Sequence, residues 1–266
     1  KKEAEMDVAL RLEINPASPD RWTISGRGEL HLSILLENLR REGYELEVSQ
    51  PEVIMKEING VACEPFETVF VEVPGDFSGT VIEIFGKRGG TVVDFKTEGS
   101  ISYLTIDTPT RGLIGIRNHL LTATKGLSII NYSFKGYAPR KAVIREKESG
   151  SLVATNPGMS TSYALKNAQV RGTLFIGPSE QVYEGMVIGA NSKSGDLPIN
   201  ACKAKELTNF RSKNQGVEEG LEPPTLLTLE KTIEYIGQDE LVEITPKSLR
   251  LRKKILKESD RRRATI

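Results

Sequence analysis

The pattern of apolar and polar positions in residues 1–62 predicts three strands and one helix. Apolar residues alternate with polar ones in the strand segments, whereas leucines recur at three- and four-residue spacing in the helical segment. In chain order, the predicted elements are a strand over 8–14, a strand over 21–25, a helix from about 29 to Gly43 and a strand over 44–55. This order matches the last two thirds of a ferredoxin-like βαββαβ module. We therefore expect the sequence to begin inside a longer chain.

Residues 63–140 repeat this organisation and complete it. Strand-like alternation and helical spacing follow each other in the order βαββαβ, with glycines and short turns between the elements. The predicted segments are 66–73, 76–88, 91–96, 101–107, 111–124 and 127–134, of which 76–88 and 111–124 are helices. We expect a complete ferredoxin-like module in this part of the chain.

From residue 141 onward the pattern changes to short strands separated by Gly, Pro and Asn turns, with helices expected near 164–170 and 229–236. The fold class predicted for the whole chain is α+β. The expected domains are an incomplete ferredoxin-like module over 1–62, a complete one over 63–140 and a strand-rich mixed α/β domain over 141–266.

Charge changes this picture only when the chain is divided into segments. The 36 Lys and Arg balance the 36 Asp and Glu, and a net charge of zero argues against nucleic-acid binding. However, residues 214–246 hold eight acidic residues and one basic residue, whereas residues 247–266 hold nine basic and two acidic ones. A second basic run, residues 203–213, contains Phe210, whose ring suits base stacking. Charge alone leaves two interpretations open: RNA contact, or solvated surface paired to the acidic segment.

The candidate nucleic-acid-binding residues lie in these two basic runs. Leu249 and Leu251 alternate with Arg250 and Arg252, so a strand here would bury the leucines and present the guanidinium groups on its other face. In the run of residues 203–213, Lys, Arg, Thr and Asn side chains offer donors suited to single-stranded RNA. The predicted binding residues are Lys203, Lys205, Thr208, Asn209, Arg211, Lys213, Arg250, Arg252, Lys254, Arg261, Arg262 and Arg263.

Signals for catalysis, cofactors and metals are weak. No G-x-x-x-x-G-K-[ST] phosphate-binding loop occurs, and neither His31 nor His119 has sequence neighbours that suggest a metal site or a triad. Cys63 and Cys202 give no disulfide framework and fit a reducing cytosol. No apolar run approaches the roughly 20 residues of a membrane span. We expect a cytoplasmic protein with no membrane partner and no catalytic, cofactor or metal site in this chain.

A family resemblance begins at residues 26–32, Gly-Arg-Gly-Glu-Leu-His-Leu. They resemble the G-x-G-E-L-H-L signature in domain III of ribosome-binding translational GTPases of the elongation factor G type, whose domains III and V are ferredoxin-like. Only residues 56–65 separate the two predicted modules, which leaves no room for the large domain IV and points to the TypA/BipA and LepA relatives. Segments similar to the TypA/BipA family lie at residues 109–115, 182–186, 205–211, 239–246 and 260–264.

The resemblance implies domains III, V and C-terminal of a TypA/BipA-type GTPase, with GTP and Mg²⁺ bound by a GTPase domain that this sequence lacks. It implies contacts with large-subunit rRNA near the ribosomal A site, with the tRNA acceptor end and with ribosomal proteins, and a segment matching residues 203–214 that approaches the rRNA A-loop. Translation regulation, large-subunit assembly, stress and cold response, and a monomer off the ribosome follow from the same resemblance. Two alternatives stay open: a LepA-type fragment, and a protein-interaction module with incidental RNA contact.

Overall fold

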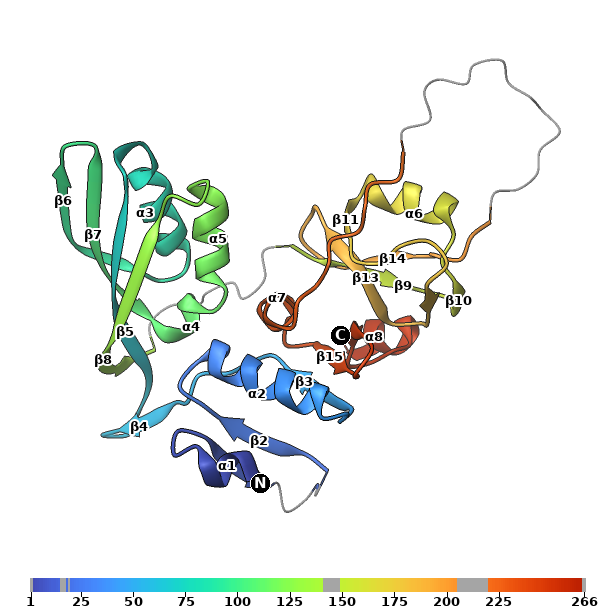
Figure 1. Ribbon diagram of the computed structural model, residues 1–266, viewed down its shortest axis with the longest axis horizontal. Helices are drawn as coiled ribbons and strands as arrows, with labels where there is room; N and C mark the ends of the chain where they lie inside the picture. The colour runs from blue at the N-terminus through green and yellow to red at the C-terminus, as the bar shows by residue number, and fades with distance from the viewer. Residues whose placement is uncertain (1, 15–17, 19, 141–148, 205–219, 265–266) are drawn as a thin grey trace. The chain divides into compact units, whose positions relative to one another are not determined.

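The chain packs as two compact units, which Figure 1 shows with their element labels. One unit consists of residues 51–146, and the other combines residues 1–50 with residues 147–266. Both units combine helices with largely antiparallel sheets, so the predicted α+β class is confirmed. The three-part domain division stays a prediction. The computed structural model describes residues 2–14, 18, 20–140, 149–204 and 220–264.

The unit of residues 51–146 is built on a five-stranded antiparallel sheet. Its long strands have the spatial order β8-β5-β7-β6, and the short strand β4 pairs with the beginning of β5. Helices α3 and α5 lie on one face of this sheet (Figure 1). This arrangement confirms the ferredoxin-like module. The elements are β4 (Lys56–Ile58), β5 (Val61–Pro74), η1 (Gly75–Phe77), α3 (Ser78–Lys87), β6 (Thr91–Glu98), β7 (Ile101–Pro109), α4 (Thr110–Leu113), α5 (Ile116–Ala123) and β8 (Ile129–Pro139).

Strict alternation in β5 supplies the core of this unit. Val69, Val71 and Val73 are at most 2% exposed and pack against Val81 and Phe85 of α3. Burying an aliphatic side chain of this size contributes about 1.5–3 kcal/mol, so a few such positions fix which face of the strand meets the helices. The other face of β5 remains open to solvent at its centre.

The prediction of one continuous helix over 111–124 is wrong. The structure has two helices, α4 and α5, which are separated at Ile114 and Gly115. Gly115 has φ +68°, a left-handed conformation that glycine adopts without steric cost and that interrupts a right-handed helix. The Arg88 guanidinium stabilises this break by donating to the carbonyl oxygen of Ile114 at 2.7 Å.

The strand predicted over 8–14 is wrong in its first half. Residues 2–6 form the helix α1 (Lys2–Met6), and the strand β1 begins only at Arg11 and ends at Ile14. The Asp7 carboxylate accepts a hydrogen bond from the backbone N–H of Ala9 at 2.8 Å, which makes a turn where the alternation had predicted a strand. Val8 is consequently 99% exposed.

The remaining N-terminal elements follow the predicted order of strand, helix and strand. β2 (Trp22–Ser25) pairs with β1, α2 spans Glu29–Arg41, and β3 spans Leu46–Ser49. α2 ends where the sequence predicted, because Gly43 adopts φ +95° and its N–H donates to the carbonyl of Arg40.

β3 is one strand of a seven-stranded sheet, and the other six strands lie between Ser151 and Lys253. The spatial order is β14-β9-β13-β16-β15-β3, with β11 also paired to β13, and the β14–β9 pair is parallel. The predicted helices near 164–170 and 229–236 correspond to α6 and α7. The elements are β9 (Ser151–Ala154), β10 (Gly158–Met159), α6 (Ser162–Gln169), β11 (Gly172–Leu174), β12 (Gln181–Val182), β13 (Met186–Asn191), β14 (Leu197–Ile199), α7 (Leu229–Tyr235), β15 (Glu240–Ile244), β16 (Leu249–Lys253) and α8 (Glu258–Ala264).

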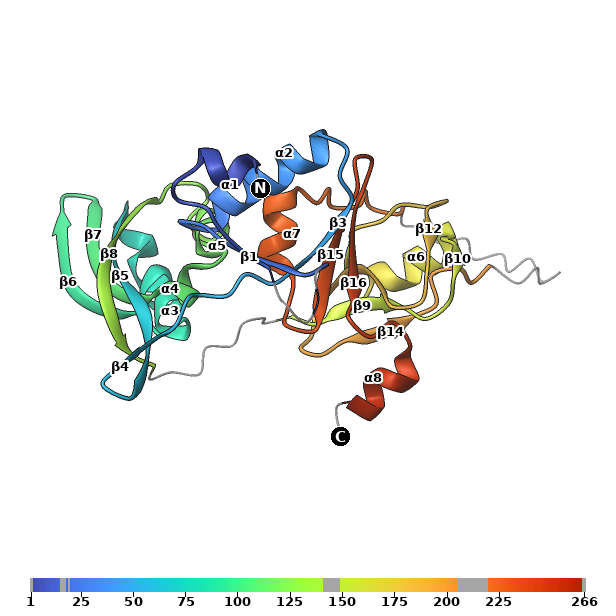
Figure 2. The ribbon, with the colours of Figure 1, turned by 90° about the horizontal axis from the view of Figure 1, so that it is seen from below.

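Residues 1–50 and 147–266 therefore share one core. Leu36 of α2 is 7% exposed and packs in the same cluster as Ile233 of α7 and Val242 of β15. Figure 2 shows α2 and α7 beside the strands β3 and β15, which pair antiparallel with Val48 opposite Val242. The first module buries its apolar helix face by packing on the last part of the chain.

Candidate nucleic-acid interface

The basic run of residues 203–213 begins beside the N-terminus of α6. Thr161 caps the N-terminus of α6 by accepting a hydrogen bond from the N–H of Ala164 at 3.1 Å. The same hydroxyl donates to the carbonyl oxygen of Lys203 at 2.6 Å, and the Thr161 N–H donates to the carbonyl of Ala201 at 3.0 Å. The Lys203 side chain is exposed. Its backbone is thus fixed while its ammonium group meets solvent.

Glu222 is held at the C-terminal end of α6. The N–H of Glu222 donates to the side-chain oxygen of Gln169, the last residue of α6, at 2.9 Å. Leu221 packs against the core cluster that contains Leu165. Both ends of the segment between them are therefore attached to one helix. Five predicted residues lie outside the part of the chain that the structure describes: Lys205, Thr208, Asn209, Arg211 and Lys213.

The basic run of residues 247–266 contains β16, and the predicted alternation is confirmed for four of its residues. Leu249 is partly buried and Leu251 is 1% exposed, while Arg250 and Arg252 lie on the other face. The two arginines differ, however. Arg250 is exposed and forms no ion pair with another described residue, whereas only 14% of the Arg252 side chain is exposed.

Arg252 lies between two carboxylates that strand pairing places opposite each other. β3 pairs with β15 so that Glu47 faces Glu243. The Arg252 Nε is 3.0 Å from Glu243 Oε1 and 3.1 Å from Glu47 Oε1. Tyr183 donates its hydroxyl to Glu243 at 2.7 Å, and burial, this hydrogen bond and the Glu243 charge raise the pKa of Tyr183. The Arg252 guanidinium is therefore committed to holding β3 on the C-terminal sheet.

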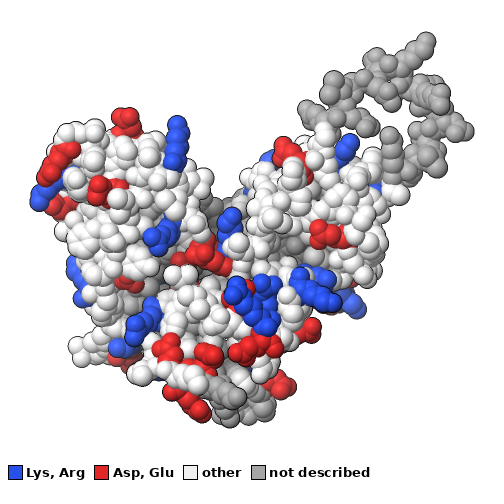
Figure 3. All heavy atoms as spheres, in the orientation of Figure 1, with Lys and Arg blue, Asp and Glu red and all other residues white. Residues whose placement is uncertain are grey.

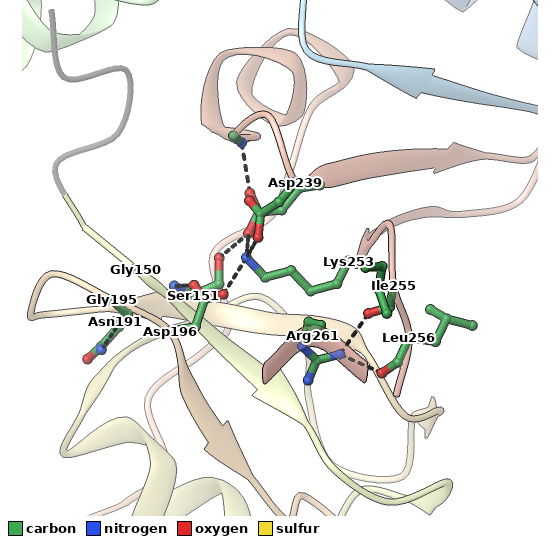
Figure 4. Close-up of polar contacts among 12 residues, drawn as sticks. Gly150, Ser151, Asn191, Gly195, Asp196, Asp239, Lys253, Ile255, Leu256 and Arg261 are labelled. Carbon is green, nitrogen blue, oxygen red and sulfur yellow. Dashed lines mark hydrogen bonds and ion pairs between the residues drawn. The ribbon is translucent and has the colours of Figure 1, made fainter. Parts of the chain in front are cut away.

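Lys253 is a buried cation that the sequence patterns did not single out. It is 2% exposed, because it follows Leu249 and Leu251 onto the buried face of β16. Its ammonium lies 2.8 Å from Asp239 Oδ2 and 3.0 Å from Glu240 Oε1, and it also contacts Asp196 (Figure 4). The alternation itself was a usable signal, because it places residue 253 with the leucines.

Charge and burial act in opposite directions on Lys253. Burial lowers the pKa of its ammonium, but the carboxylates of Glu240, Asp196 and Asp239 raise it more, so the pKa lies above its usual value. Glu240 is fully buried, and its second oxygen accepts from the N–H of Gly237 at 2.9 Å. This cluster joins β16 to the turns before β14 and β15, and its polar groups serve the fold.

The three C-terminal arginines belong to α8, a helix that was not predicted. Arg261 donates to the carbonyl oxygens of Ile255 and Leu256, which closes the turn before the helix (Figure 4). Arg262 lies 2.5 Å from Glu258 and Arg263 lies 3.6 Å from Asp260, both along the helix. Most of the side chains of Arg262 and Arg263 are exposed, so these pairs are weak and leave the guanidinium groups accessible.

Lys254 and Arg250 are the remaining exposed cations among the predicted binding residues that the structure describes. Lys254 is exposed, and its N–H donates to the carbonyl of Asp239 at 2.8 Å. Arg250 borders an open groove of about 950 Å³ between α2, the start of α7 and β16, together with Arg41 and Lys247. On the face that Figure 3 shows, basic and acidic side chains lie next to one another. Any anion contact here depends on individual groups.

Two negative findings, on metal binding and on membrane crossing, apply to the described part of the chain. Within it, no group of three or more His, Cys, Asp or Glu side chains is arranged to hold a metal ion. Among the helices it contains, none has both the length and the apolar character needed to cross a membrane.

Two family models match this chain. One, described as the TypA/BipA C-terminal domain, matches residues 149–258, and the other, described as the elongation factor G C-terminus, matches residues 61–148. The second match coincides with the ferredoxin-like unit, and the first with the part of the seven-stranded sheet that follows it.

Curated relatives match over almost the whole chain. The Large ribosomal subunit assembly factor BipA of Bacillus subtilis is 45% identical over 262 residues, which are 98% of this chain and 43% of the relative. The protein of the same name from Escherichia coli O157:H7 is 42% identical over 99% of this chain and 44% of the relative. The Putative elongation factor TypA-like SVR3, chloroplastic, of Arabidopsis thaliana is 45% identical over 94% of this chain and 37% of its own length. This chain thus spans about two fifths of the length of these relatives.

Proposed function

The chain belongs to the TypA/BipA family as its C-terminal part, and on that premise we propose that it binds large-subunit rRNA and serves assembly of the large ribosomal subunit. The observation that carries the proposal is similarity over 94–99% of this chain to relatives, two of which are named large ribosomal subunit assembly factors. The contacts that we assign are those of the 203–213 segment and of the exposed cations of β16 and α8.

The structure of the segment's ends supports this assignment. Lys203 and Glu222 are fixed at opposite ends of α6, so the residues between them start and finish at defined positions. A contact surface on a fixed base loses less conformational entropy on binding than a free tail does. Arg250 and Lys254 add exposed charge that forms no ion pair with a described carboxylate.

The finer parts of the proposal concern the partner and the full-length protein. We place the rRNA contact near the A site, next to the tRNA acceptor end and ribosomal proteins. GTP and Mg²⁺ would bind outside this sequence, because the chain contains no G-x-x-x-x-G-K-[ST] loop that could cradle phosphates. We further propose a monomer off the ribosome, a cytoplasmic location in bacteria, and roles in translation regulation and in stress and cold response.

The test is replacement of Lys203, Lys205, Arg211 and Lys213 by Ala together in the full-length protein. Binding to purified large subunits is measured by co-sedimentation over a salt series. We expect weaker binding and a smaller slope of log affinity against log salt, because each lost phosphate contact removes about 0.7–0.9 from that slope. Wild-type affinity and slope would exclude this segment as an rRNA contact.

A matched control removes the same charge elsewhere in the same unit. Arg11, Arg171, Lys193 and Lys231 are exposed and lie outside the predicted set. Their joint replacement by Ala should leave the salt slope close to that of the wild type. An equal loss in both variants would show that only net charge matters.

A second candidate function is a protein-interaction module in which the basic end of the chain binds acidic surface. One observation favours it for one residue: Arg252 lies against Glu243 and Glu47 of the same chain. Arg250 and Lys254 show no such pairing with described residues, so for them we retain the RNA contact.

A further inference from the structure

The ferredoxin-like unit has one sheet face that none of its own helices covers. α3 and α5 lie on the face that carries Val69, Val71 and Val73 (Figure 1). On the opposite face, the two central strands β5 and β7 present aromatic rings to solvent: Phe70 is 48% exposed and Tyr103 is 39% exposed. Large exposed aromatic groups on adjacent strands are typical of an interaction surface.

Strand register shows which residues surround these rings. One row across the sheet runs from Ile129 in β8 through Glu72 in β5 and Tyr103 in β7 to Lys96 in β6. Phe70 lies in the next row, diagonal to both Tyr103 and Ile129. Directly opposed side chains on one sheet face have Cβ atoms about 4.5–5.5 Å apart. The Glu72 carboxylate is therefore set among two aromatic rings and one aliphatic side chain.

The charge of this face is negative. Its ionisable residues are Glu72, Asp94, Lys96, Glu98, Asp107 and Lys135, four acids and two bases, which give a net charge of −2. Lys96 lies 3.2 Å from Asp94, and Lys135 contacts Asp107, so each base is already paired. Glu72 and Glu98 have no ion pair with any other described residue.

Two kinds of ligand suit aromatic rings on the central strands of such a sheet. RNA-binding sheets of this topology stack bases on such rings, but phosphates need a positive surface, and this face has a net charge of −2. A Lys or Arg side chain instead gains from the ring faces and from the free carboxylate together. We propose that this open face, which we call the β5–β7 face, docks a basic polypeptide segment, with a Lys or Arg against Phe70, Tyr103 and Glu72.

The first test uses the chain itself and a labelled peptide that alternates Arg and Thr, measured by fluorescence anisotropy. E72Q, and separately the double variant F70T/Y103T, should each weaken binding about threefold to tenfold. Threonine keeps the β-propensity of these strand positions, and urea midpoints show whether the variants stay folded. The control is E83Q, which removes a carboxylate from α3, on the helix side of the sheet, and should change the affinity less than twofold. Equal affinity of wild type, E72Q and F70T/Y103T would overturn the proposal.

The second test identifies the partner class on purified large ribosomal subunits, and that arm alone rests on the proposed function. A photo-crosslinking amino acid replaces Tyr103 in the full-length protein, with Glu83 as the control position. Crosslinks from residue 103, but not from residue 83, to Lys- or Arg-rich protein segments support the inference, and crosslinks to rRNA overturn it. If the protein does not bind the subunits at all, the proposed function fails while the peptide experiment still decides this inference.

Discussion

At the scale of single residues, four basic side chains in and just after β16 occupy three different environments. Arg250 is exposed, Arg252 lies between Glu47 and Glu243, Lys253 is buried among three carboxylates, and Lys254 is exposed beyond the end of the strand. Paired carboxylates directly across from each other repel unless a cation lies between them. The positive charge of this strand is therefore divided between holding the fold and facing solvent.

We expect the substitution R252A to destabilise the unit formed by residues 1–50 and 147–266 by about 1–2 kcal/mol, because it leaves Glu47 and Glu243 facing each other without a cation. Urea unfolding measures this loss. R250A is the matched control and should change the free energy of unfolding by less than about 0.5 kcal/mol. Equal midpoints for R252A and wild type would show that the ion pairs do not stabilise the sheet.

At the scale of elements, the segment Thr110–Ile114 explains one stretch of family similarity by packing. A Cβ on Gly112 would lie 2.4 Å from the carbonyl oxygen of Arg88, so only glycine lets α4 approach the end of α3 this closely. The Arg111 side chain, 11% exposed, forms an ion pair with Glu64, which is 1% exposed. These contacts hold α4 against β5 and α3, and they give this stretch a structural role.

Replacing Gly112 by Ala should destabilise the unit of residues 51–146 by about 1–3 kcal/mol, since the added methyl group meets rigid backbone. Gly79→Ala is the control in the same unit. A Cβ at position 79 in α3 meets no atom within 4 Å, and alanine favours a helix over glycine by about 0.5–1 kcal/mol. Thermal melting should therefore move in opposite directions for the two variants, and a stabilised G112A would refute the close approach.

At the scale of the whole molecule, the two units build their cores in different ways. The core of residues 51–146 contains only residues of that contiguous segment, among them Val81, Ile106 and Leu120. The other unit has one cluster of C-terminal residues around Leu165. Its second cluster combines Leu36 and Val48 from the N-terminal part with Ile233 and Val242 from the C-terminal part. Local unfolding of α2 should consequently destabilise the seven-stranded sheet.

Hydrogen exchange read by mass spectrometry tests this coupling. Leu36→Ala should cost about 2–5 kcal/mol and lower amide protection in α7 and β15, which lie some 200 residues away in sequence. Protection in β5 and β7 should stay unchanged. Leu120→Ala, in the core of the other unit, should give the reverse pattern. If L36A lowers protection only within α2, the shared core does not act cooperatively.

The sequence by itself determined the elements whose information is local. Alternation in β5 and β7 and helical spacing in α3 predict the ferredoxin-like unit, because its core residues all lie within residues 69–130. The same local alternation correctly assigns Leu251 and Arg252 to opposite faces of β16. Turn chemistry was missed at Asp7 and Gly115, where a single hydrogen bond or a left-handed glycine overrides the pattern.

Only the tertiary structure decided what lies opposite each face. Alternation gives the direction of a side chain but not the strand that pairs beside it, and β3 meets β15 across nearly 200 residues of chain. That pairing brings Glu47 to Arg252, which turns a predicted RNA contact into an ion pair within the fold, and leaves Arg250 facing solvent. Whether each charged side chain forms an ion pair or faces solvent depends on non-local packing. The strand on which it lies is predicted by the local sequence alone.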